Sequence, residues 1–88
     1  MAEVRAFAVP GVKLWFWSND HEPPHFHAKR RGEWEVRVFF PLDKSEMVEV
    51  VRGRTPPKRV LRHLTELAEQ NRVALLEQWE ELRKSENY

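Results

Sequence analysis

The sequence predicts an α+β domain in which a four-stranded antiparallel sheet is followed by two C-terminal helices packed on one of its faces. Two patterns predict this fold. In the first 54 residues apolar and polar side chains alternate with a period of two, which is typical of half-buried strands. From residue 55 onward apolar side chains recur every three or four positions, as in an amphipathic helix. Strands that precede helices in this way favour a sheet with helices on one side.

Length and composition restrict the class of protein. A chain of 88 residues predicts a single domain, with a β-rich part over 1–54 and a helical part over 55–84. The sequence has no cysteine, which excludes a disulfide framework and thiolate metal sites. It shows neither a signal peptide nor an apolar run long enough to span a membrane, so a cytoplasmic location is expected.

Net charge is +1, but the charge is unevenly distributed. Residues 1–62 hold 12 Lys/Arg against 8 Asp/Glu (+4), and residues 63–88 hold 3 against 6 (−3). The first part of the chain is therefore mildly basic and the C-terminal end is acidic.

Four strands are predicted, over residues 12–17, 25–30, 33–40 and 47–52. Phe7 and Val9 suggest a further edge strand. A tight turn is predicted at Arg31-Gly32, with Gly32 in the left-handed conformation of a type I turn with a bulge. The side chains expected to face the helices are Val12, Leu14, Phe16, Phe26, Ala28, Trp34, Val36, Val38 and Phe40.

Two helices are predicted after the sheet. Thr55 is expected to cap the first, with Pro56 at its first position. Asn71 is expected to cap the second, and one kinked helix is the alternative.

Residues 20–27 form the densest group of titratable side chains and contain three of the four histidines. Pro23 and Pro24 make this segment stiff and extended. In the strand that follows, His25 and His27 should point to one face of the sheet and Phe26 to the other.

Three interpretations of this motif remain. A divalent metal such as zinc would be bound by His25 and His27, with His21, Asp20 or Glu22 completing the set. Alternatively, the two histidines act as general acid and base beside Asp20 and His21, as in a metal-independent ribonuclease, with Arg37 or Lys29 as the phosphate-binding cation. In the third interpretation, side-chain hydrogen bonds only stabilise the loop.

The face of the sheet opposite the helices is a candidate binding surface. Alternation places Trp15, Trp17, Lys29 and Arg37 on it together with the histidines. Stacking rings and cations favour single-stranded nucleic acid, most of all RNA. A protein partner or a second copy of the chain would suit the same surface. Arg52, Arg54 and Arg59 belong to a basic run that either binds phosphate or is simply solvated.

The run Asp20-His21-x-Pro23-Pro24-His25-Phe26-His27, followed by a glycine turn and a strand, resembles a family of small bacterial proteins catalogued as domain of unknown function 4160. Leu75-Leu76 and Trp79 in the closing helix are similar too, whereas the turn at Arg30-Arg31-Gly32 departs from the family's usual Tyr-Gly.

The resemblance implies a small bacterial protein that is encoded beside another small gene, in an arrangement like a toxin–antitoxin pair. The expected function is therefore binding or cleavage of RNA, or binding of a small protein partner encoded nearby. The alternative is a metal-dependent enzyme of unknown substrate.

Overall fold

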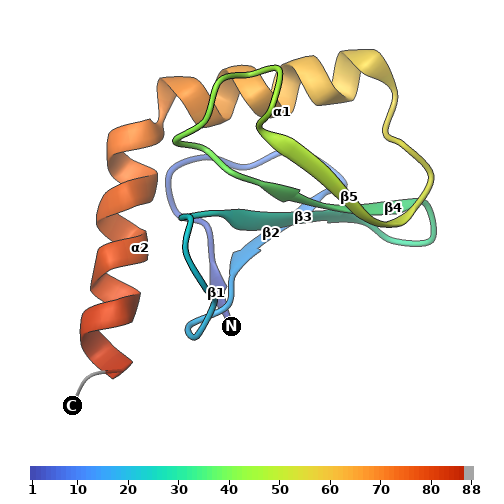
Figure 1. The fold of residues 1–88 in the computed structure, drawn as a ribbon. Coiled ribbons are helices and arrows are strands. Elements are labelled where there is room, and N and C mark those ends of the chain that lie inside the picture. The colour runs from blue at the N-terminus through green and yellow to red at the C-terminus, as the bar shows by residue number, and fades with distance from the viewer. Residues whose placement is uncertain (87–88) are drawn as a thin grey trace.

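Five strands form one antiparallel sheet whose order in space follows the order of the chain (Figure 1). The computed structural model describes residues 1–86, and the side chains of 1–84. The elements are β1 (Ala2–Glu3), β2 (Lys13–Phe16), β3 (Phe26–Arg30), β4 (Trp34–Val38), β5 (Val48–Gly53), α1 (Lys58–Gln70) and α2 (Arg72–Glu86).

The predicted α+β layout is confirmed, but the sheet has five strands and not four. The additional strand is β1, which pairs with β2 through Ala2 opposite Phe16 and Glu3 opposite Trp15. A strand of two residues is too short to show alternation. Phe7 and Val9 do not form the suggested edge strand, because Val9 makes only an isolated bridge to Val12.

Alternation predicted correctly which face of each strand meets the helices. Phe16, Phe26 and Val36 are fully buried, and they belong to one apolar cluster with Leu64 of α1 and Leu75 of α2. Val12 is part-buried at the margin of this cluster. The connection between β3 and β4 is a tight turn as predicted, but its type differs. Gly32 is the only turn residue with positive φ, at +79°, and the Glu33 N–H donates to the Arg30 carbonyl, which makes it a type II turn.

The predicted start of the first helix is wrong. The residue that caps α1 is Pro57, with no side-chain hydrogen bond, and Thr55 is exposed. Because Pro57 follows Pro56, its ring disfavours helical backbone at Pro56, so the helix begins later. The break at Asn71 is confirmed. Its side-chain amide donates to the Leu67 carbonyl and ends α1, while its own carbonyl accepts the first hydrogen bond of α2, from the Leu75 N–H.

The second helix runs past one end of the sheet, whereas α1 lies across its face (Figure 1). Gln78 of α2 is buried and bonds to the backbone beside β1: its Nε2 donates to the Glu3 carbonyl at 2.8 Å, and its Oε1 accepts from the Arg5 N–H at 3.0 Å. Arg83 forms an ion pair with Glu22 at 2.9 Å. The helix is thereby tied both to the first strand and to the histidine loop. Within the described residues, no helix is both long enough and apolar enough to cross a membrane.

Candidate functional site

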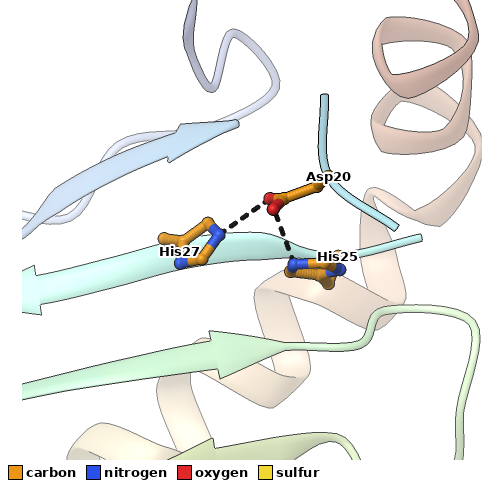
Figure 2. A group of neighbouring side chains, drawn as sticks. All are labelled: Asp20, His25 and His27. Atoms are coloured by element: carbon orange, nitrogen blue, oxygen red, sulfur yellow. Dashed lines mark hydrogen bonds and ion pairs between the residues drawn. The ribbon is translucent and has the colours of Figure 1, made fainter. Parts of the chain in front are cut away.

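The loop between β2 and β3 folds back so that Asp20 lies over the start of β3 (Figure 2). One carboxylate oxygen, Oδ2, is 2.9 Å from Nε2 of His27 and 3.1 Å from Nε2 of His25. The two imidazoles face the same side of the strand, as alternation predicts, and their ring centroids are 5.1 Å apart. The Glu22–Pro23 peptide bond in this loop is cis.

All three side chains are substantially removed from water. The side chains of His25 and His27 are 7% and 6% exposed, and that of Asp20 is 21% exposed. The prediction placed both imidazoles on an accessible surface. They do lie on the outer face, but the loop and neighbouring rings cover them, so solvent reaches the cluster on the Asp20 side.

The position of the His25 proton follows from its neighbours. Nδ1 of His25 lies 2.9 Å from the Pro23 carbonyl oxygen, which can only accept, so Nδ1 donates. In the neutral ring Nε2 therefore carries a lone pair. This atom is buried and makes no hydrogen bond of acceptable geometry, although the Asp20 oxygen is only 3.1 Å away.

His27 is oriented by a ring contact as well as by the carboxylate. Its Nε2 is within hydrogen-bond distance of Asp20 Oδ2, whereas its Nδ1 is buried without a partner. Trp15, which pairs with His27 across β2 and β3, stacks on the imidazole at 5.2 Å with 18° between the planes. Trp17 meets the same imidazole nearly edge-on at 6.4 Å.

His25 is enclosed by two further aromatic rings. The ring of Phe39 lies 5.0 Å from that of His25, and the ring of Trp79, on α2, lies 5.7 Å from it. Two aromatic residues therefore flank each imidazole. Three nearby elements hold the cluster in place: the β2–β3 loop, the sheet and the last helix.

The structure brings together three of the four residues predicted as catalytic. His21, predicted both as a catalytic group and as a metal ligand, is exposed and does not belong to the cluster. Glu22, the other suggested ligand, is exposed and forms an ion pair with Arg83. The ligand atoms of Asp20, His25 and His27 all lie within 4.8 Å of one another.

The predicted binding residues do not form one patch. Trp15 is buried under its neighbours, whereas Trp17 is 43% exposed. Arg37 is bound to Glu49 by an ion pair of 2.6 Å. The remaining predicted cations fall in two places. Lys29 and Arg52 line a hollow on the outer face together with both tryptophans. Arg54 and Arg59 are exposed at the β5–α1 junction.

Sequence reasoning missed two contributors. The Pro23 carbonyl fixes the proton of His25, but it is a backbone atom that no residue pattern reveals. Lys13 lines the same hollow, and its ammonium lies over the Trp15 ring at 5.4 Å. Alternation places Lys13 on the outer face with Trp15 and Trp17, but it was not among the predicted binding residues.

Comparison with known proteins identifies a family for this chain. A family model described as Domain of unknown function (DUF4160) matches residues 11–80, a span that includes all four longer strands, α1 and the histidine loop. This match confirms the resemblance inferred from the motif. No curated protein and no solved structure matches the chain.

Proposed function

We propose that this chain, which belongs to the DUF4160 family, binds one divalent metal ion through Asp20, His25 and His27 and presents a metal-bound water molecule for hydrolysis. The convergence of two imidazole nitrogens and one carboxylate oxygen within 4.8 Å carries this proposal. Two histidines and one carboxylate are a frequent ligand set for zinc and related ions.

Electrostatics at His25 supports a cation in the cluster. When its Nδ1 donates to Pro23, the neutral ring turns a lone pair toward the Asp20 carboxylate at 3.1 Å. Two electron-rich atoms at this distance repel each other in a poorly solvated site. A positive charge shared between them removes the repulsion, and a metal ion is better placed for this than a proton on Nε2, because the geometry at Nε2 is poor for a hydrogen bond.

The ligand separations are also suitable. Zinc bonds of about 2.0–2.2 Å in a tetrahedron place neighbouring ligand atoms roughly 3.3 Å apart. The two nitrogen–oxygen separations here are 2.9 and 3.1 Å, close to this value, and the three ligand atoms all lie within 4.8 Å of one another. The bond from His25 Nδ1 to a backbone carbonyl is the usual outer interaction that orients a metal-binding histidine.

The number of ligands suggests what the ion does. Structural zinc sites use four protein ligands, whereas catalytic sites use three and leave one position for water. A bound metal lowers the pKa of such a water to about 7 and makes hydroxide available at neutral pH. Asp20 is the most exposed of the three ligands, so the water position would face the solvent on its side.

The expected place in a two-gene, toxin–antitoxin-like pair stays a prediction, which co-purification with the neighbouring gene's product would test.

Metal titration tests the proposal. The protein is stripped with a chelator and titrated with cobalt(II), whose visible absorption reports coordination, and then with zinc in competition. One equivalent should bind. Asp20→Asn and His27→Ala should weaken binding by at least about tenfold. His21→Ala, in the same loop, and His63→Ala, on α1, remove exposed histidines and serve as matched controls that should bind as the wild type does.

Two results would contradict the proposal. One is the absence of saturable binding at micromolar metal. The other is equal weakening in His21→Ala and His27→Ala, which would indicate non-specific binding by surface imidazoles.

A further inference from the structure

We infer that the outer face of the sheet carries a binding site for single-stranded nucleic acid, beside the proposed metal site and independent of it. The site is a hollow of about 660 Å³, called here the basic hollow. This volume is within the range of about 300–1,000 Å³ that is usual for ligand sites. The basic hollow is lined by Met1, Lys13, Trp15, Trp17, Lys29, Arg31, Glu35 and Arg52.

The register of the sheet concentrates cations in the basic hollow. Lys13 of β2 stands directly opposite Lys29 of β3, Lys29 opposite Glu35 of β4, and Glu35 opposite Arg52 of β5. Like charges in directly opposite positions destabilise a sheet. With Arg31 from the turn, four cations share the hollow with one acid, so an anionic ligand would relieve the repulsion between Lys13 and Lys29.

These cations outnumber the one acid of the basic hollow and form no close ion pair with it. Elsewhere on the surface, Arg5, Arg37 and Arg83 each form an ion pair with a glutamate. Among the described residues, none of the four cations of the basic hollow forms such a pair. Their charge is therefore available to a ligand. A phosphate group is the most suitable anion, because lysine and arginine form strong charge-assisted hydrogen bonds with it.

An exposed aromatic ring at the hollow narrows the choice of ligand. Trp17 is 43% exposed and is held edge-to-face against Trp15, with the ring centroids 6.1 Å apart. A supported, partly exposed indole beside cations suits a planar base with its phosphate. The bases of a duplex have their faces covered by neighbours, so the ring selects a single strand. An acidic protein segment would use the cations but not the indole.

The position of the basic hollow connects it to the histidine cluster. Trp15 lines the hollow and also stacks on His27, so one indole separates the bound strand from the proposed metal site. Binding itself needs only Trp17 and the cations. It should therefore persist in a chelator, and its failure can be distinguished from failure of the metal proposal.

Fluorescence anisotropy with a labelled RNA and a labelled DNA of ~12 nucleotides, measured in chelator across a salt series, tests the inference. Trp17→Ala should weaken binding by about 5- to 150-fold. The double variant Lys13→Gln/Lys29→Gln should reduce the slope of log affinity against log salt by about 1.4, or about 0.7 for each phosphate that is no longer neutralised. Arg62→Gln removes one exposed positive charge from α1, which lies across the other face of the sheet (Figure 1), and should bind like the wild type.

Three outcomes would overturn the inference: no binding of either strand at about 50 mM salt, wild-type affinity in Trp17→Ala and in the double lysine variant, or equal displacement by an oligoglutamate. The last outcome would identify an acidic protein as the occupant. Circular dichroism of each variant confirms that it is folded. A preference for RNA or for DNA identifies the ligand, and equal affinity means that the site accepts either kind of single strand.

Discussion

The two faces of this sheet obey the same alternation but are buried in different ways. On the inner face, Phe26 and Val36 are covered by the helices and contact only an apolar cluster. On the outer face, His25 and Trp15 are nearly as well buried, yet each has a buried nitrogen without a hydrogen bond. On the inner face, burial of apolar side chains stabilises the fold, and this is sufficient to explain their presence there. Among the described residues, three buried nitrogens without a hydrogen bond lie on the outer face (Trp15 Nε1, His25 Nε2 and His27 Nδ1) and one, Trp34 Nε1, on the inner face. Burial of unpaired polar groups is costly, so their concentration on the outer face points to a function there.

The cover on the outer face comes from distant parts of the chain. Asp20 reaches the histidines through the β2–β3 loop, Trp79 contacts His25 from α2, and β1 pairs with β2 beside Trp15. Each of these segments covers a small part of the outer face. The outer face is therefore closed around the histidines, whereas the basic hollow is open to solvent, with Trp17 on its lining.

The largest expected difference between the faces is in apolar packing. Phe26→Ala should destabilise the fold by about 3–5 kcal/mol, because Phe26 is fully buried and contacts Phe7, Phe16 and Phe40. The total stability of a domain of this size is about 4–13 kcal/mol. Phe39→Ala, on the outer face and part-buried, should cost only roughly 1–2 kcal/mol. Urea denaturation compares the two, and equal losses would mean that the faces do not differ in packing.

A smaller effect is expected at the carboxylate of the outer face. Without metal, Asp20→Asn should cost about 1–3 kcal/mol, because this substitution removes the charged acceptor of the hydrogen bond from His27 Nε2. His21→Ala, nearby but exposed, should change the free energy of unfolding by less than about 0.5 kcal/mol. If Asp20→Asn is instead as stable as the wild type, the cluster contributes nothing to the fold and only its ligand-binding role remains.

The smallest effect on stability is expected at the edge of the basic hollow. Trp17→Ala should cost about 0.5–1 kcal/mol, because this partly exposed ring makes only edge-on contacts, with Trp15 and His27. Trp15→Ala, two residues away on the same face, should cost about 3–5 kcal/mol because that ring is buried. Thermal unfolding of both variants measures the contrast. A large loss in Trp17→Ala would show that this ring supports the sheet and would remove the reason to regard it as a binding surface.

The sequence predicted those features that depend on neighbouring residues along one strand or helix. Alternation alone placed Phe16, Val36 and His27 on their correct faces, and the helix break at Asn71 followed from local composition. The sequence could not predict how a loop folds back onto the sheet. Asp20 and His21 are adjacent in the chain, yet only Asp20 turns back onto β3.

The errors in the predicted fold have the same origin. β1 exists because β2 offers it backbone hydrogen bonds, not because Ala2 and Glu3 show any pattern of their own. Trp15 was expected to be exposed, since alternation gives the direction of a side chain but says nothing of what covers it. Long-range contacts therefore decided which outer-face residues remain accessible.

The hydrogen bonds of Gln78 also affect how the molecule meets other chains. Its side-chain amide offers one donor and one acceptor, as a peptide group does, and it satisfies the Glu3 carbonyl and the Arg5 N–H at the free side of β1. The side chain thus replaces a sixth strand at this point. Unpaired groups of this kind are a common starting point for aggregation through added strands. A second copy that extended the sheet here would have to displace Gln78 first, so this edge is protected against an added strand.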